Sequence, residues 1–282
     1  MKKSCAEVID YFIADQLAKG KSKNTAKTYR QTLSSFADWL TAAGGDIDDL
    51  TRHDVQSYVK HLQEAGKSAA TIGKVFACLS VFSRFLGRPG AVENVRIPEQ
   101  RKKRNIAPQS LERNERNRLL REVERDGNLR DIAITYLLLL TGLRVSELCA
   151  LNRSDVVIGE RSGKVTVRDG KGGIARTVPL SAEARLYLTK YLATRTDSKK
   201  ALFLSNFKDS ERIAARTIQH MLKKYGVHPH KLRHTFCREL VSAGVDIATV
   251  AELAGHADIN VTRRYAMPNE AELERVIDRA FS

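Results

Sequence analysis

The stretch from Ile132 to Leu148 reads IAITYLLLLTGLRVSEL, which puts a charged residue shortly after a strongly apolar segment. The apolar run IAITYLLLL is about nine residues long, whereas a membrane-spanning helix needs about twenty, so we expect a buried core helix. Gly142 then breaks the pattern, and Arg144 is predicted to begin the next helix. We therefore expect Arg144 to be held rigidly beside backbone N–H groups that can bind phosphate. The alternative for this stretch alone is an ordinary arginine paired with Glu147.

The charge of the 282-residue chain favours a polyanionic partner. It has 48 Lys and Arg residues against 33 Asp and Glu residues, a formal net charge of +15. Neutralising phosphates with such residues gives a strong, sequence-independent contribution to nucleic-acid binding. The four cysteines are scattered through apolar helical patterns, as is typical of reduced cytosolic thiols. Because no signal peptide is evident at the N-terminus, we predict a cytoplasmic protein that binds nucleic acid.

The first hundred residues are predicted to be wholly helical. Apolar positions recur at three- and four-residue steps in four segments, at about residues 8–17, 26–40, 55–62 and 72–86. Composition changes after Gly87, where prolines and the basic run at 101–104 (RKKR) indicate an interdomain linker. We expect a helical domain at 1–98, a basic linker at 99–107 and a second domain at 108–282.

The second domain is predicted to combine helices with one small hairpin. Residues 164–168 alternate between polar and apolar, residues 169–173 (DGKGG) supply a glycine-rich turn, and residues 174–180 return as a second strand. Helical patterns resume at 182–193, 216–224 and 231–243. The expected fold class of the whole chain is mainly α with a small β-sheet.

Lys171 lies in the predicted hairpin turn, where a lysine can reach into a groove and deliver a proton. Lysines are common in turns, so an ordinary solvated side chain is the alternative here. The surrounding glycines do not form a nucleotide-binding P-loop, because the pattern GxxxxGK[ST] cannot be fitted around Lys171.

Residues 228–237 read HPHKLRHTFC and concentrate three imidazoles and a guanidinium. The proline favours a helix start, which places His230 and Arg233 on one face of the first turn. Together they form a candidate phosphate-binding pair with an acid or base attached. His230, His234 and Cys237 also have the helical spacing of metal ligands, although no fourth ligand is evident. A pair of structural histidines is the other alternative.

Residues 255–265 read GHADINVTRRY, so that His256 and Tyr265 lie close together in the sequence among several cations. Asp246 is predicted to cap a short helix before this stretch, and Asn260 to cap the next helix. Two short helices of this kind also resemble a helix-turn-helix of a DNA-binding regulator, which is the strongest non-catalytic alternative.

The four stretches together suit the attack of a tyrosine hydroxyl on a phosphodiester. Tyrosine has an ordinary pKa of about 10, so as a nucleophile it needs a proton acceptor and a cationic environment. Negative charge develops on the non-bridging oxygens of phosphorus, and two arginines can hold it. A lysine or histidine can protonate the departing 5′ oxygen. The scheme requires neither a metal nor a cofactor.

In order, spacing and local context, six residues resemble the active site of the tyrosine recombinases: Arg144, Lys171, His230, Arg233, His256 and Tyr265. The first hundred residues resemble that family's helical, SAM-like core-binding domain, and residues 22–40 look like its second helix. The resemblance covers nearly the whole chain. It implies a DNA-binding bundle followed by an α+β tyrosine-recombinase catalytic domain with a C-terminal helix.

The resemblance also implies roles for these residues. Tyr265 would form a 3′-phosphotyrosyl link to DNA and release a 5′ hydroxyl. His230 would act as acid or base on the tyrosine, and Lys171 would protonate the leaving oxygen.

For the scissile phosphate, the resemblance implies binding by Arg144 and Arg233 and a hydrogen bond from His256. Glu147 would support the arginine without reacting itself.

Members of the family act as tetramers on two synapsed duplexes and exchange strands through a Holliday junction without ATP. The resemblance therefore implies a homotetramer on a double-stranded recombination site, with or without an accessory protein or a second recombinase. The chain looks like the compact Xer-type or transposon-resolving members, and dimer resolution, cointegrate resolution and integration or excision of mobile DNA all stay open. An apolar stripe at 273–281 either covers its own domain or docks into a neighbouring protomer.

Overall fold

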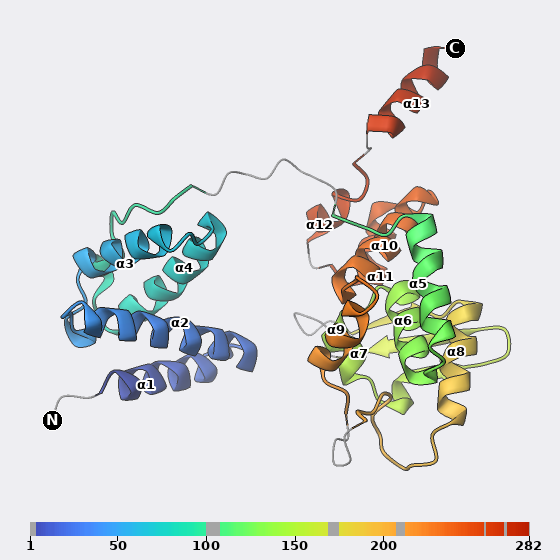
Figure 1. The fold of residues 1–282 in the computed structure, drawn as a ribbon, viewed down its shortest axis with the longest axis horizontal. Coiled ribbons are helices and arrows are strands. Elements are labelled where there is room, and N and C mark those ends of the chain that lie inside the picture. The colour runs from blue at the N-terminus through green and yellow to red at the C-terminus, as the bar shows by residue number, and fades with distance from the viewer. Residues whose placement is uncertain are drawn as a thin grey trace. The chain divides into compact units, whose positions relative to one another are not determined.

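The computed structural model describes residues 4–99, 108–168, 175–206, 212–256, 258–267 and 270–281. The chain forms two compact units, Met1–Lys103 and Arg104–Ser282 (Figure 1). No helix within the described ranges is long and apolar enough to cross a membrane. Lys171 with the rest of the predicted hairpin turn, and nearly all of the predicted linker, lie outside the described residues.

The first unit is a bundle of four α-helices: α1 (Cys5–Ala18), α2 (Lys23–Ala42), α3 (Arg52–Glu64) and α4 (Ala69–Phe85). A Ser or Thr precedes each helix, and its side chain accepts a hydrogen bond from the backbone N–H three residues later. Phe12, Phe36 and Phe82 are fully buried between the helices. The predicted helical N-terminal region is confirmed.

The second unit combines helices with one small sheet, which confirms the mainly α fold class. The helices are α5 (Arg113–Arg125), α6 (Leu129–Thr141), α7 (Val145–Ala150), α8 (Ala182–Ala193), α9 (Ala215–Lys223), α10 (Pro229–Ser242), α11 (Ile247–Ala254), α12 (Ile259–Arg263) and α13 (Glu270–Phe281). Helix α6, which contains the apolar run, is buried and packs against α5, α8 and α10.

The sheet has the strand order β1-β2-β3, formed by Val156–Ile158, Gly163–Val167 and Arg176–Pro179, and both pairings are antiparallel. β2 and β3 are the two strands of the predicted hairpin. The prediction missed β1, because a strand of three residues carries too little periodicity to be recognised. Val165 and Val178 are partners across β2 and β3, and both are buried in the core of the unit.

The two short helices near Tyr265 have aspartate caps. Asp246 caps α11 as predicted, since its side chain accepts a hydrogen bond from the N–H of Thr249. The prediction that Asn260 caps the next helix is wrong, because Asp258 caps α12 and accepts from the N–H of Asn260 at 2.9 Å. Asn and Asp are about equally good caps, so two candidates two residues apart could not be ranked from sequence.

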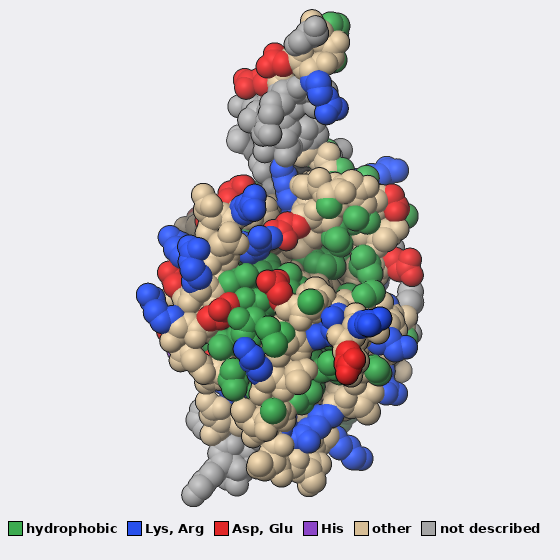
Figure 2. All heavy atoms as spheres, turned by 90° about the vertical axis from the view of Figure 1, so that its right-hand side faces the viewer, with side chains coloured by type: hydrophobic (Ala, Val, Ile, Leu, Met, Phe, Trp, Pro, Cys, Tyr) green, Lys and Arg blue, Asp and Glu red, His purple; other side chains and the backbone are tan. Residues whose placement is uncertain are grey.

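Charge is mixed on the face of the molecule that Figure 2 shows. On the face in Figure 2, Lys and Arg side chains are spread among apolar and acidic ones.

Candidate active site

Five of the six predicted site residues line one cavity in the second unit. The cavity has a volume of about 310 Å³ and is lined by Arg144, His230, Arg233, His234, His256, Asp258, Val261 and Tyr265. These residues come from the junction of α6 and α7, from the start of α10 and from the segment around α12, so distant parts of the sequence meet here. The sixth residue, Lys171, is outside the described residues.

Arg144 is held between two helices. Helix α6 ends at Gly142, which has a left-handed φ of 62°, and Arg144 occupies the N-cap position of α7. Its Nη1 donates to Oε1 of Glu147 at 2.7 Å, and its Nη2 donates to the carbonyl of Gly255 at 2.7 Å. The sequence left two alternatives for Arg144, a rigidly held phosphate-binding residue or an ordinary ion pair with Glu147. In the structure Arg144 is both rigidly held and paired with Glu147.

Arg233 lies near the start of α10, one turn after Pro229, and is only 4% exposed. Its Nη1 donates to the carbonyl of Gly142 at 2.5 Å, whereas its Nη2 is buried without a hydrogen-bond partner. Burial, and then repulsion from Arg144, lower the pKa of Arg233 to about 10. An unsatisfied buried N–H is costly, so an anion in the cavity would be bound favourably at this nitrogen.

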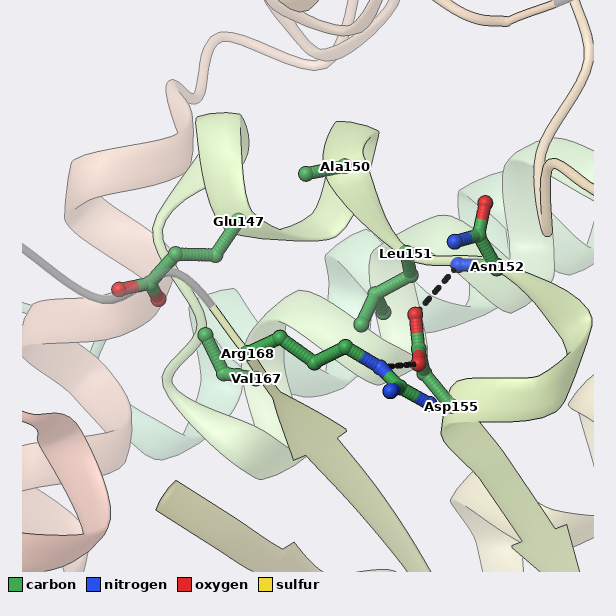
Figure 3. Close-up of a pocket in the computed structure, with 7 residues that line it drawn as sticks. All are labelled: Glu147, Ala150, Leu151, Asn152, Asp155, Val167 and Arg168. Carbon is green, nitrogen blue, oxygen red and sulfur yellow. Dashed lines mark hydrogen bonds and ion pairs between the residues drawn. The ribbon is translucent and has the colours of Figure 1, made fainter. Parts of the chain in front are cut away.

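Glu147 is a buried carboxylate that binds two arginines. Besides Arg144, Arg176 donates to it, from Nη1 at 3.0 Å and from Nη2 at 2.8 Å. Burial alone would raise the pKa of Glu147, but the hydrogen bonds and charges of the arginines hold it at about 2. In Figure 3 its carboxylate points away from the ion pair of Arg168 and Asp155 in the adjoining pocket. Glu147 is therefore ionised and engaged by arginines of the site.

Tyr265 is 3% exposed, and its hydroxyl lies 2.6 Å from Nδ1 of His234. Burial, and then the neighbouring Cys237, raise the pKa of Tyr265 well above its usual value, although Arg233 opposes the shift. The hydroxyl is therefore protonated near neutral pH and needs a proton acceptor before it can attack. The side chain packs in a small apolar cluster with Phe236, Cys237, Val250 and Ala254.

Three histidines around the tyrosine are neutral near pH 7. Burial is the main cause that lowers the pKa of His230, His234 and His256, and nearby positive groups add to it. The pKa values of His234 and His256 fall to about 4. The ring of His256 lies nearly parallel to that of Tyr265, with centroids 6.3 Å apart, and its Nδ1 is 2.8 Å from Oγ1 of Thr262. Neutral imidazoles accept protons, so the cavity offers acceptors close to the hydroxyl.

His234 is the imidazole that contacts Tyr265, whereas the sequence suggested for it only a metal ligand or a structural histidine. One feature of the sequence could have indicated this role: His234 directly follows Arg233, on the helix that carries the candidate phosphate-binding pair. Within the described ranges, no group of three or more His, Cys, Asp or Glu side chains is arranged to hold a metal ion. A helix-turn-helix presents its reading side chains to a DNA groove, and the burial of Tyr265 does not suit that alternative.

Two family models match the chain. The model of the phage integrase family matches residues 109–272, and that of the phage integrase N-terminal SAM-like domain matches residues 8–90. The chain is 34% identical to the tyrosine recombinase XerA of Pyrococcus furiosus over 98% of this chain and 94% of that protein. It is 31% identical to the tyrosine recombinase XerD of Bifidobacterium longum over 88% of this chain and 87% of that protein.

Solved structures show the same fold. A crystal structure of XerA recombinase is 27% identical, with a TM-score of 0.54, and the match covers 99% of both chains. The crystal structure of XerH site-specific recombinase bound to difH substrate, in a pre-cleavage complex, has a TM-score of 0.71. That match covers 98% of this chain and 85% of the other at 18% identity.

Proposed function

We propose that Tyr265 is the nucleophile of this chain, which belongs to the phage integrase family and is a site-specific tyrosine recombinase that cleaves and rejoins DNA. The Tyr265 hydroxyl attacks the scissile phosphorus, forms a 3′-phosphotyrosyl link and displaces the 5′ oxygen, which leaves as a hydroxyl. The observation that carries the proposal is that the hydroxyl contacts the imidazole of His234 and shares one cavity with Arg144 and Arg233.

Arg144 and Arg233 bind the non-bridging oxygens of the scissile phosphate. Each guanidinium has five N–H donors, and the partnerless Nη2 of Arg233 supports this role because an anion would satisfy it. Both cations are fixed before substrate arrives, through the Glu147 carboxylate and the Gly142 and Gly255 carbonyls. Prearranged donors of this kind stabilise charge in the transition state by about 3 to 4 kcal/mol each.

The neutral imidazoles move the protons. In the observed geometry His234 is the acceptor closest to the Tyr265 hydroxyl, and His230 lines the same cavity. His256 donates a hydrogen bond to the phosphate. Lys171, whose role rests on the sequence alone, protonates the departing 5′ oxygen.

Residues 1–98 form the DNA-binding domain and residues 108–282 the catalytic domain, joined by the basic linker at 99–107. The cytoplasmic enzyme acts as a homotetramer on two synapsed sites through a Holliday junction, with or without an accessory protein or a second recombinase. Ile277 and Phe281 on α13 are 57% and 85% exposed, which supports docking of this helix into a neighbouring protomer. The same chemistry serves resolution of dimers or cointegrates and integration or excision of a mobile element.

The test uses a nicked duplex that carries the sequence this protein binds, selected from a random library, without metal or ATP. The nick lets the short fragment with the new 5′ hydroxyl diffuse away, so that the covalent intermediate accumulates. We expect a denaturation-resistant protein–DNA adduct with the wild type and a loss of about 10⁴-fold or more in Tyr265→Phe.

Tyr136→Phe is the matched control for this test. Tyr136 is 4% exposed, its hydroxyl donates to Glu124, and it does not line the cavity. This variant should form the adduct at nearly the wild-type rate. An adduct in Tyr265→Phe, or tight site-specific binding by the wild type with no adduct, would overturn the proposal.

A further inference from the structure

We propose that Arg176, on β3, is a positioning residue of the recombinase site that acts through Glu147 and through the backbone preceding His256. Arg176 does not line the cavity and is not part of the motifs that identified the site. The proposal rests on the proposed function of the cavity and adds a residue behind it that sets its geometry.

The guanidinium of Arg176 is engaged on three sides. Its Nη1 and Nη2 bind the two oxygens of Glu147, and its Nε donates to the carbonyl of Leu253 at 3.0 Å. The side chains of Arg176 and Glu147 are 8% and 4% exposed. A bidentate pair in so poorly solvated a place fixes the plane of the carboxylate, because rotating it breaks hydrogen bonds that water cannot replace.

The carboxylate fixed in this way is also the partner of Arg144. Its Oε1 accepts from Nη1 of Arg144 at 2.7 Å, and its Oε2 accepts from the backbone N–H of Arg144 at 2.8 Å. Glu147 therefore links Arg176 behind the cavity to Arg144 at its wall. Because two arginines share one negative charge, Arg144 keeps positive charge available for phosphate. Without Arg176, Glu147 would neutralise Arg144 alone and draw its guanidinium away from the cavity.

Arg176 also packs against the backbone that leads into His256. Gly255 ends α11 with a φ of 67°, and a Cβ at this position would lie 2.5 Å from Nη1 of Arg176. The end of α11 is bound from both sides, since Arg176 takes the carbonyl of Leu253 and Arg144 takes that of Gly255. One buried arginine thus holds two phosphate-facing elements of the cavity, Arg144 and the segment of His256, in register.

The experiment separates this role from a merely structural one by a matched control, Arg195→Met. Arg195 is also nearly buried, binds both oxygens of a carboxylate, Asp197, and donates to the carbonyl of Leu202 at 2.6 Å. Neither Arg195 nor Asp197 lines the cavity. Arg195→Met therefore removes the same kind of interaction from the same unit without reaching the site.

Four further full-length variants are compared with the wild type: Arg176→Met, Arg176→Lys, Glu147→Gln and the double variant Arg176→Met/Glu147→Gln. Thermal unfolding verifies that each is folded, gel shift gives DNA affinity, and single-turnover adduct formation at saturating nicked DNA gives the cleavage rate. For Arg176→Met we expect a cleavage rate lower by roughly 10- to 100-fold, with DNA affinity within about threefold. Lysine keeps the charge but cannot span three acceptors, so Arg176→Lys should recover only part of the rate.

If Arg176 acts through Glu147, the losses will not multiply. The double variant should cleave no more slowly than the slower single variant, because residues of one network are non-additive. Multiplied losses would overturn the proposal. So would an equal loss in Arg195→Met at a comparable melting temperature, which would mark Arg176 as structural.

A measurement that does not depend on DNA cleavage distinguishes failure of this proposal from failure of the proposed function. In the DNA-free protein, an NMR titration follows the His256 imidazole, whose protonation is opposed first by burial and then by the charges of Arg233, Arg144 and Arg176. In Arg176→Met the midpoint of this titration should rise, because a positive charge that opposes protonation is removed, while Arg195→Met should leave it unchanged. An unchanged midpoint would overturn the positioning role even if the wild type forms the adduct. Absence of adduct in the wild type, with the midpoint shifted, would overturn only the proposed function.

Discussion

The cavity has two halves that differ in charge. In the cationic half, Arg144 and Arg233 line the cavity and donate hydrogen bonds to the ionised carboxylate of Glu147 behind it or to backbone carbonyls. In the neutral half, Tyr265 and His234 are shifted away from their charged forms by burial. The cationic half is ready to receive an anion, whereas the neutral half keeps its nucleophile protonated.

Burial alone does not explain why the two halves differ in charge, because the side chains of both are poorly exposed. The arginines make the difference, since they stabilise the charge on Glu147 and oppose protonation of His256. A phosphate that enters the cavity would offset their charge and so make the imidazoles better proton acceptors. Binding of substrate in the cationic half would thus favour proton transfer in the neutral half.

Replacing Arg233 should have the largest effect, because it removes the guanidinium with the unsatisfied nitrogen. We expect Arg233→Met to lower the single-turnover cleavage rate by about 10³-fold, as for loss of a prearranged donor to a charged transition state. DNA affinity should change little, because one phosphate contact is a small part of a large basic interface. Cleavage within tenfold of the wild type would show that the cationic half is not where the phosphate is activated.

Gly142 lies between the halves, so its replacement should disturb both. Its carbonyl binds Arg233, and a Cβ would lie 2.3 Å from Cδ1 of Phe236, which packs in the cluster around Tyr265. With a φ of 62° and this clash, we expect Gly142→Ala to cost about 3 kcal/mol of unfolding free energy in denaturant titrations.

Gly244→Ala is the control, because Gly244 also has a positive φ, of 83°, but open space around its Cβ position. It should cost only about 1 kcal/mol. Equal losses in the two variants would mean that backbone strain alone, and not the approach of Phe236, requires Gly142.

Much of the fold and of the cationic half could be predicted from the sequence, since local patterns carry them. The apolar run and Gly142 gave the end of α6 and the place of Arg144. The proline in HPHKLRHTFC gave the start of α10, and with it the common face of His230 and Arg233.

The contact of His234 with Tyr265 and the pairing of Arg176 with Glu147 could not be predicted, because each joins distant segments of the chain. His234 meets Tyr265 across 31 residues, and Arg176 meets Glu147 across 29 residues. Helical periodicity shows which side chains share a face, but not which element packs on that face. An arginine on a short strand also has no sequence feature that separates it from a solvated one.

The smallest effect concerns pH and tests whether the neutral half is neutral. His234 and His256 have pKa values of about 4 in the folded chain against an ordinary value of 6.5. Between these values the unfolded chain binds protons that the folded chain does not. Stability is therefore complete above about pH 6.5 and is lost as the pH falls towards 4. Because both rings are partly solvated, we expect a loss on the order of 1 kcal/mol for each.

Carboxylates also lose stabilising charge between pH 7 and pH 4, so the contribution of the two histidines must be isolated. The measurement therefore compares the wild type with a variant that lacks both imidazoles, at two pH values. Urea unfolding at pH 7 and pH 5 should show a smaller loss for His234→Gln/His256→Gln than for the wild type, because glutamine does not titrate. An identical loss would mean that folding does not lower the pKa values of the imidazoles. A smaller loss in the wild type than in the variant would mean that the folded chain holds them protonated at pH 7. His234 would then donate to the Tyr265 hydroxyl and could not take its proton, and the contrast between the two halves would be one of packing and not of charge.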